Sequence, residues 1–148
     1  MDFFAGIYSW LIELYGSDLD SFLYDTSDGK NYLIVGVVML LISFVLPLLH
    51  YIIIDKPNWG HWWCWLIVFA INALLNLWWG WQPVLQNLYD GYMDVKDPRT
   101  GQMVQNVTET NCFMFGIATM ILGIIAFIFF SLICSRFSTN NKYSPFVK

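Results

Sequence analysis

Charged side chains are scarce in this chain. They make up 12% of its 148 residues, whereas a soluble domain of this length carries about 25%. With 57% of the residues hydrophobic, too little polar surface remains to cover a water-facing globule. The composition excludes an ordinary soluble domain and indicates a lipid bilayer as the surrounding solvent.

Groups that commonly serve catalysis or bind metals are also few. The chain has 3 cysteines, Cys64, Cys112 and Cys134, and they lack metal-like spacing, so we interpret them as buried small hydrophobes. His61 and Cys64 have no further ligands at metal-binding spacing. No serine nucleophile, intramembrane carboxylate pair or phosphate-binding glycine loop is recognisable. We therefore expect no enzyme activity, no metal and no cofactor. We expect no cleavable signal peptide either, because Asp2 stands where basic residues would begin one.

The chain does contain long hydrophobic runs. Uncharged runs cover residues 32–54, 62–81 and 112–135. Crossing ~30 Å of hydrocarbon takes about 20 helical residues, so each run is long enough. The sequence predicts an all-α integral membrane protein with three transmembrane helices, and the bilayer is its first expected partner.

The charges divide unevenly between the two sides of such a membrane. Three crossings put residues 1–31 and the loop 82–111 on one side, and the loop 55–61 and the basic polar tail 136–148 on the other. The first side carries ten acidic and three basic residues, the second one acidic and four basic. Because lysine and arginine favour the cytoplasm, we expect a cytoplasmic C-terminus and an N-terminus outside.

Residues 1–31 are predicted to form an amphipathic helix followed by an acidic loop. Apolar residues at positions 3, 4, 7, 8, 11, 14 and 15 follow helical spacing. The run is too short to cross, which favours a helix lying on the bilayer surface. Two alternatives stay open: this helix enters the mouth of an assembly, or it forms a fourth, unusual crossing.

The loop 82–111 is predicted to contain a small β-hairpin. Apolar and polar residues alternate over 92–107, on both sides of a five-residue connection that begins at Asp97 and ends at Gly101. The triplet Asn106-Val107-Thr108 matches the glycosylation pattern. Such triplets are common by chance, so we treat this one as incidental.

Two polar side chains interrupt the second hydrophobic run. Asn72 and Asn76 are four residues apart, so they share one helix face, and Gly80 continues it. The free-energy cost of leaving an amide exposed to lipid is several times larger than the stabilisation gained from one hydrogen bond between helices. Both asparagines must therefore face protein or water.

The third run carries a seam of small residues, which lets helix backbones approach closely. Its members are Gly116, Thr119, Gly123 and Ala126. The seam and the asparagines could be buried against each other within one chain, or they could face another protomer.

We expect a homo-oligomeric channel or pore-like assembly that conducts ions or perturbs the membrane, as effector or toxin proteins do. Asn72 and Asn76 would line or close its central path, and a soluble or membrane protein could trigger it. The alternative is a non-catalytic accessory subunit of a larger membrane complex. Nucleic acid is not an expected partner, because the larger polar side is acidic.

A second group of residues is a candidate for pH sensing or gating. His50 lies near the end of the first run, close to Asp55 and His61, and histidine titrates near neutrality. Pro47 removes one backbone donor and kinks the first helix. The same residues could be ordinary interfacial histidines and a structural kink. An undetected site for lipid chemistry around His50, Asp55 and His61 is a third possibility.

Overall fold

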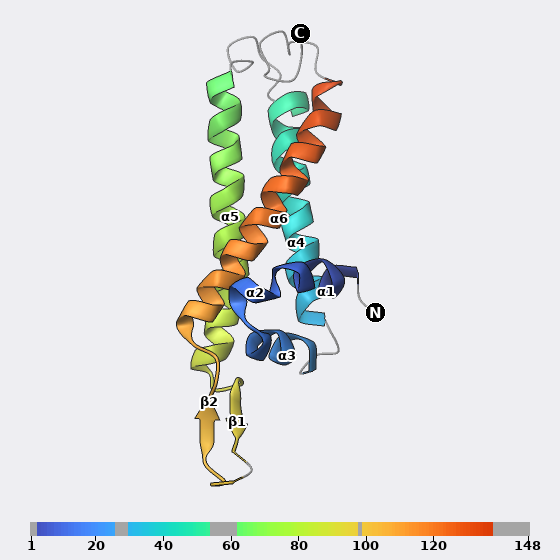
Figure 1. The fold of residues 1–148 in the computed structure, drawn as a ribbon. Coiled ribbons are helices and arrows are strands. Elements are labelled where there is room, and N and C mark those ends of the chain that lie inside the picture. Colours follow the sequence, from blue (N-terminus) through green and yellow to red (C-terminus); the bar gives the residue numbers. More distant parts are fainter. Residues whose placement is uncertain (1–2, 26–29, 54–61, 98, 138–148) are drawn as a thin grey trace. The chain divides into compact units, whose positions relative to one another are not determined.

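Three long helices form most of the structure, a computed structural model that describes residues 3–25, 30–53, 62–97 and 99–137 (Figure 1). They are α4 (Lys30–Leu48), which continues as five π-helical residues (Leu49–Ile53), α5 (Trp62–Tyr89) and α6 (Glu109–Ser135). All three are long and apolar enough to cross a membrane, as the three hydrophobic runs predicted.

Two of these helices are longer than the runs that predicted them. The helix α5 continues past Trp81 to Tyr89, because Val84 and Leu88, four residues apart, bury one face of the extension. The helix α6 begins at Glu109, before the start of the run that predicted it. The negative charge of Glu109 is favourable in a first helical turn.

The chain divides into two compact units, and each contains part of every long helix. Unit 1 comprises Met1–Val37 and Leu77–Thr119, and unit 2 comprises Val38–Asn76 and Met120–Lys148. The N-terminal helices and the hairpin belong to unit 1.

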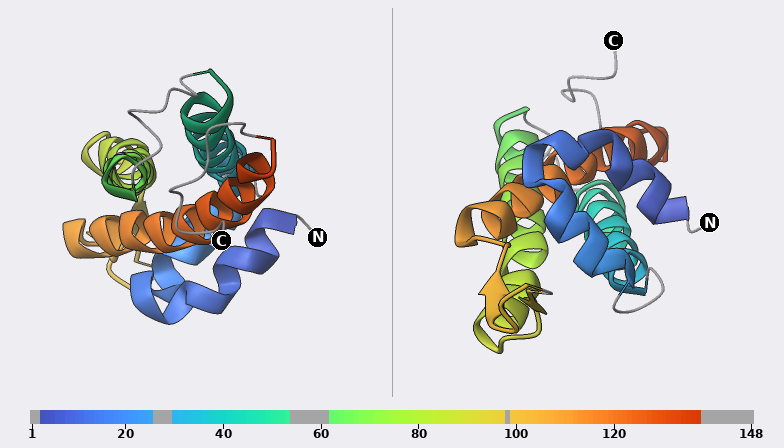
Figure 2. Two further views of the ribbon diagram at one scale, coloured as in Figure 1. Left: turned by 90° about the horizontal axis from the view of Figure 1, so that it is seen from above. Right: turned by 60° about the horizontal axis from the view of Figure 1, so that its bottom comes forward.

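The N-terminal segment is helical, as predicted, but it is interrupted. It consists of α1 (Phe3–Tyr8), a 3-10 turn (Ser9–Leu11) and α2 (Ile12–Tyr15). At the interruption the Ser9 hydroxyl donates to the carbonyl of Gly6 at 2.8 Å, a local bond that competes with regular helix geometry. In unit 1 these helices lie against α6 and the start of α4 (Figure 2).

The predicted acidic loop is wrong over Ser17–Asp25, which form the helix α3. Asp18 and Asp20 lie in its first turn, where negative charge is stabilised by the helix dipole. Leu19 and Leu23, four residues apart, are buried. The acidic composition hid this short helix, although the spacing of its two leucines could have revealed it.

The predicted hairpin is confirmed. Strand β1 (Asp94–Lys96) pairs antiparallel with β2 (Met103–Gln105), and Val95 lies opposite Val104. Beyond the strands, the backbone N–H of Asp97 donates to the carbonyl of Gln102 at 2.9 Å. Gly101 has a φ of 69°, the left-handed conformation expected of a glycine at this turn.

The side chain of Asp97 stabilises the turn. It accepts hydrogen bonds from the backbone N–H of Arg99 at 2.8 Å and from the Thr100 hydroxyl at 2.9 Å. Because these donors favour the charged carboxylate, they lower the pKa of Asp97.

Candidate functional site

The two asparagines lie in a buried polar cluster of unit 2. This amide cluster consists of Ser43 from α4, Asn72 and Asn76 from α5, and the backbone carbonyl of Gly123 from α6. The three side chains are completely buried. Asn72 Nδ2 donates to the Gly123 carbonyl at 3.2 Å, and the Ser43 hydroxyl donates to the same oxygen at 3.0 Å. The cluster therefore connects all three long helices.

Asn76 completes the network. Its Nδ2 donates to Ser43 Oγ at 3.3 Å, and to the carbonyl and Oδ1 of Asn72 at 3.0 and 3.2 Å. Its Oδ1 has no hydrogen-bond partner among the described residues. A single chain thus buries both asparagines, and their burial requires no second protomer.

Gly123 makes this contact possible because it has no side chain. A Cβ at this position would lie 2.5 Å from Nδ2 of Asn76. The predicted asparagine face and the predicted small-residue seam therefore meet within unit 2, which is one of the two arrangements that the sequence left open.

The rest of the seam brings α5 and α6 together in unit 1. A Cβ on Gly80 would lie 2.5 Å from the Thr119 hydroxyl oxygen and 3.1 Å from Cα of Gly116. A Cβ on Gly116 would lie 2.9 Å from the carbonyl oxygen of Leu77. These glycines mark a helix contact too close for any larger residue. Ala126, in unit 2, is half-buried. A role for these residues in an oligomer or a pore stays a prediction.

The predicted gating group is only partly described. Pro47 lies inside α4, just before the helix widens into its π-helical turn. His50 is buried and lies edge-on to the ring of Tyr51, with centroids 4.7 Å apart. Asp55 and His61 lie outside the described residues, so the proposed group of three stays a prediction.

Sequence reasoning missed a second polar link in unit 2. Trp65 Nε1 donates to the Ser131 hydroxyl oxygen at 2.9 Å, and this hydroxyl donates to the Tyr51 hydroxyl oxygen at 3.3 Å. A serine in a helix gives no clear signal in the sequence, because its hydroxyl can donate to the helix's own backbone instead of to another helix. Only the positions of neighbouring helices distinguish the two cases.

Unit 1 contains an aromatic cluster, made of Tyr8, Tyr15, Tyr32 and Phe115. All four side chains are at most 1% exposed. The ring of Phe115 on α6 lies 5.2 Å from those of Tyr8 and Tyr15 and 6.0 Å from that of Tyr32. These distances are typical of favourable stacked and edge-on ring pairs. The cluster packs the N-terminal segment against α4 and α6.

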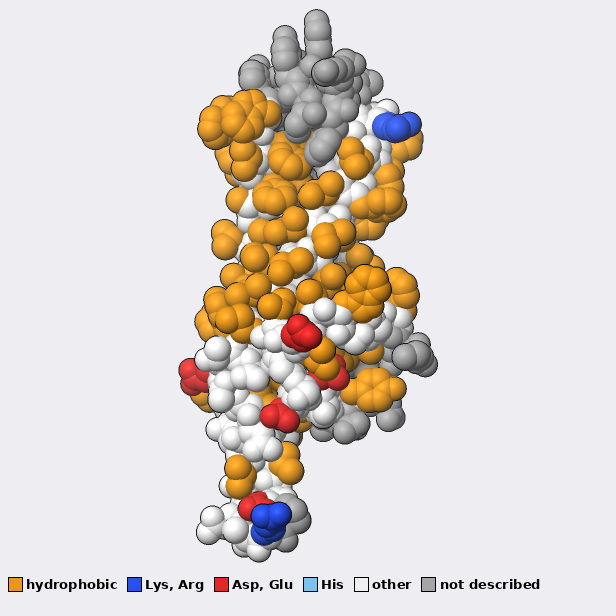
Figure 3. Space-filling model, in the orientation of Figure 1, with side chains coloured by type: hydrophobic (Ala, Val, Ile, Leu, Met, Phe, Trp, Pro, Cys, Tyr) orange, Lys and Arg blue, Asp and Glu red, His pale blue; other side chains and the backbone are white. Residues whose placement is uncertain are grey.

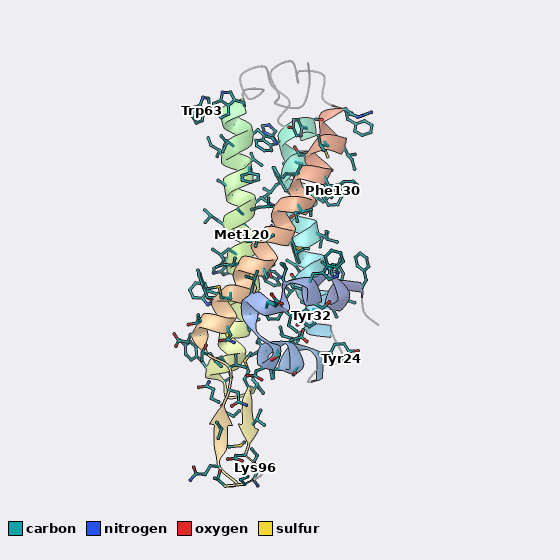
Figure 4. The ribbon with its side chains drawn as sticks, viewed as in Figure 1. Tyr24, Tyr32, Trp63, Lys96, Met120 and Phe130 are labelled. Carbon is teal, nitrogen blue, oxygen red and sulfur yellow. The ribbon has the colours of Figure 1, made fainter. Side chains whose placement is uncertain are left out.

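Each tyrosine hydroxyl in the cluster is hydrogen-bonded. Tyr8 donates to Thr119 Oγ1 at 3.2 Å, and the Tyr15 and Tyr32 hydroxyls are 3.2 Å apart. Asp20 on α3 accepts from Tyr32 and, at 3.3 Å, from Tyr15. Figure 4 shows Tyr32 at the start of α4, next to the N-terminal helices. This network adds α3 to the elements that the cluster holds together.

Alkaline pH is expected to loosen the N-terminal segment. Burial raises the pKa of Tyr8 from its ordinary 10.0 to about 12, and burial raises the pKa of Tyr15 as well. Since the unfolded segment ionises at lower pH than the folded one, the stabilisation is complete below pH 10.0 and is lost as the pH rises toward about 12. Tyrosinate absorbance recorded with protease sensitivity would measure this. A Tyr8→Phe variant should lose part of this dependence, and an unchanged profile would contradict the assignment.

A groove lies between α3 and the hairpin, in unit 1. Its volume is about 370 Å³, and it is lined by Asp18, Ser21, Phe22, Tyr92, Met93, Val95, Asn106 and Val107. Met93 and Val107 are buried at its floor, whereas Val95 is 56% exposed. We call this the head groove. Sequence reasoning missed it because α3 was not foreseen.

The described residues contain no group of three or more His, Cys, Asp or Glu side chains that could hold a metal ion. Comparison of the chain with protein-family models, with curated proteins and with solved structures found no match.

Proposed function

We propose that this chain is a multi-pass integral membrane protein, with α4, α5 and α6 as its three crossings, and that it serves as a non-catalytic accessory subunit. The first part is supported by the surface of the helices. Large hydrophobic side chains are exposed along all three, and Figure 3 shows hydrophobic side chains gathered over much of the visible surface. Examples are Leu41, Ile67, Leu74 and Ile125, each more than half exposed. A soluble protein rarely exposes so continuous an apolar surface, whereas lipid requires it.

The aromatic residues agree with a bilayer. Trp62 and Trp63 are exposed in the first turn of α5, where the amphipathic indole rings would lie at the level of the headgroups. Figure 4 shows Trp63 at this end of α5. The N-terminal segment exposes Phe3 and Trp10, by 71% and 86%. Such side chains suit a helix lying in the interface.

One observation carries the accessory role. The amide cluster is hydrogen-bonded within the chain, and the head groove lies beside α3 and the hairpin, outside the three apolar helices. The polar groups of the crossings are therefore already used within the chain and offer a partner little to bind, whereas unit 1 has a groove on its surface. A protein with such a surface and no recognisable catalytic group is best suited to binding another protein.

Gentle extraction followed by sizing tests this role. A defined complex with an unlike protein is expected when the chain is purified from its own membrane. A particle that contains this chain alone, whether one copy or several, would contradict the accessory role.

The orientation is proposed from the charges, with the hairpin outside and residues after Ser135 in the cytoplasm. Asn106 provides a test, because its side chain is exposed and it begins a glycosylation triplet. When the chain is inserted into endoplasmic-reticulum microsomes, the hairpin should face the lumen and Asn106 should become glycosylated. The product should migrate more slowly until the glycan is removed enzymatically. Asn106→Gln should abolish the shift, and an unshifted wild-type chain would contradict this orientation.

A homo-oligomeric channel, gated by pH or by a protein trigger, is the second candidate. It is favoured by Oδ1 of Asn76, a buried acceptor without a partner among the described residues, as a group beside a water path would be. Planar-bilayer recording of the purified protein would test it. Conductance that is lost in Asn76→Leu but kept in Leu74→Ala, an exposed position of the same helix, would support a channel. Absence of conductance would exclude it.

A further inference from the structure

The head groove has the features of a peptide-binding site on an incomplete sheet. Its hairpin wall belongs to a two-stranded sheet, so in the described part of the chain each strand has one edge that no other strand pairs. Unpaired edges accept an extended segment as an added strand, which gains backbone hydrogen bonds. A hairpin of two three-residue strands is marginal by itself and would be stabilised by a third.

The hairpin also presents apolar side chains that nothing in the described chain covers. Val95 and its cross-strand partner Val104 lie on the same face of the hairpin and are 56% and 42% exposed. Cross-strand pairs of this kind normally stabilise a sheet by packing against a covering layer. An occupant that buries them must therefore carry apolar side chains of its own.

The charge of unit 1 indicates the second property of the occupant. Asp18 forms part of the groove wall and is exposed. The described charged side chains of unit 1 are seven acidic (Glu13, Asp18, Asp20, Asp90, Asp94, Asp97, Glu109) and two basic (Lys96, Arg99). A second copy of this unit would be repelled, whereas a basic segment would be attracted.

We propose that the head groove binds an extended segment of a partner protein in which lysine or arginine alternates with apolar residues. The apolar side chains enter the groove over Met93 and Val107, and a basic side chain pairs with Asp18. The segment adds to an open edge of the hairpin. This inference rests on the proposed accessory function and names the site and chemistry through which it acts.

The test uses the full chain in lipid nanodiscs and a fluorescent peptide of alternating valine and arginine. We expect saturable binding by fluorescence anisotropy, weakened by salt because part of the attraction is between exposed charges. The same peptide with glutamate in place of arginine should bind at least tenfold more weakly. Equal binding of the two peptides would overturn the proposal.

Charge reversal inside and outside the groove provides a matched pair of variants. Asp18→Lys should weaken binding of the arginine peptide at least tenfold, and Val95→Asp should do the same by removing apolar contact. Glu13→Lys adds the same charge at an exposed acid of α2 that does not line the groove, and it should change binding less than threefold. All three positions are exposed, and Asp18→Lys and Glu13→Lys each replace an acid in the first turn of a helix, so these two variants should lose the same small amount of thermal stability. Wild-type affinity in Asp18→Lys would overturn the site.

The peptide assay also separates this inference from the accessory function. If an unlike partner copurifies equally with wild type and with Asp18→Lys and Val95→Asp, the groove is wrong and the accessory function stands. If no partner copurifies but the peptide pattern holds, the accessory function is wrong and the groove stands. A photo-crosslinker at position 95 that yields mainly a product of twice the chain mass would identify a second copy as the occupant and overturn the proposal.

Discussion

Replacing Gly116 with valine is expected to prevent the close packing of α5 and α6 in unit 1. A Cβ at this position would lie 2.9 Å from the carbonyl oxygen of Leu77, and 2.9 and 3.2 Å from Cβ and the backbone N of Trp81. Two of these atoms belong to the helix backbone, so no side-chain rotation relieves the overlap. Overpacking of this kind typically lowers the free energy of unfolding by about 1–3 kcal/mol, because a helix must move to relieve the overlap. Denaturant titration in detergent, followed by tryptophan fluorescence, would measure the loss of stability.

Gly6→Ala is the matched control for this variant. Gly6 also lies in a helix of unit 1, but a Cβ there would have nothing within 4 Å. Alanine is the better helix former by about 1 kcal/mol, so this substitution should be neutral or slightly stabilising. If Gly116→Val unfolded at the same denaturant concentration as the wild type, the close contact between α5 and α6 would be refuted.

Replacing Phe115 with alanine is expected to release the N-terminal segment from the long helices. Phe115 is completely buried, and its ring contacts all three tyrosines of the aromatic cluster. Truncation of a buried phenylalanine to alanine costs about 3–5 kcal/mol through lost contacts and a cavity. Since the tyrosines hold α1 and α2, this loss should fall mainly on the segment, which limited proteolysis detects as new cleavage before residue 25.

Phe129→Ala provides the comparison. Phe129 lies on the same helix but is 60% exposed, so its truncation removes surface that already faces outward. We expect an unchanged proteolysis pattern in that variant. Equal protease resistance in Phe115→Ala and Phe129→Ala would show that the aromatic cluster does not hold the segment.

The aromatic cluster and the head groove are connected through α3. Asp20, in the first turn of α3, accepts hydrogen bonds from the cluster, while Asp18 and Phe22 of the same helix line the groove. Loss of the cluster should therefore also weaken peptide binding to the groove. Phe115→Ala tested with the valine–arginine peptide would reveal this dependence, although Phe115 does not line the groove.

For the asparagine pair, the sequence predicted burial but not the groups that the two amides contact. Spacing alone placed Asn72 and Asn76 on one face and required them to avoid lipid, and both are completely buried. It did not decide between a second protomer, water and the same chain. Their partners are Gly123 and Ser43, which lie 51 and 33 residues away. That choice depends on the rotation of three helices about their axes, which no local pattern encodes.

Local sequence patterns were enough to predict the three apolar helices, the hairpin and the helical N-terminus. Each depends on residues that are near one another in the chain: the length of a hydrophobic run, the turn that ends in Gly101, and apolar spacing over 3–15. Two features became visible only in the folded chain: Ser17–Asp25 form a helix with a groove beside it, and Tyr8 and Thr119, 111 residues apart, share a hydrogen bond. Short helices and buried polar groups gain most of their stability from distant neighbours, so their outcome depends on packing that composition and periodicity do not specify.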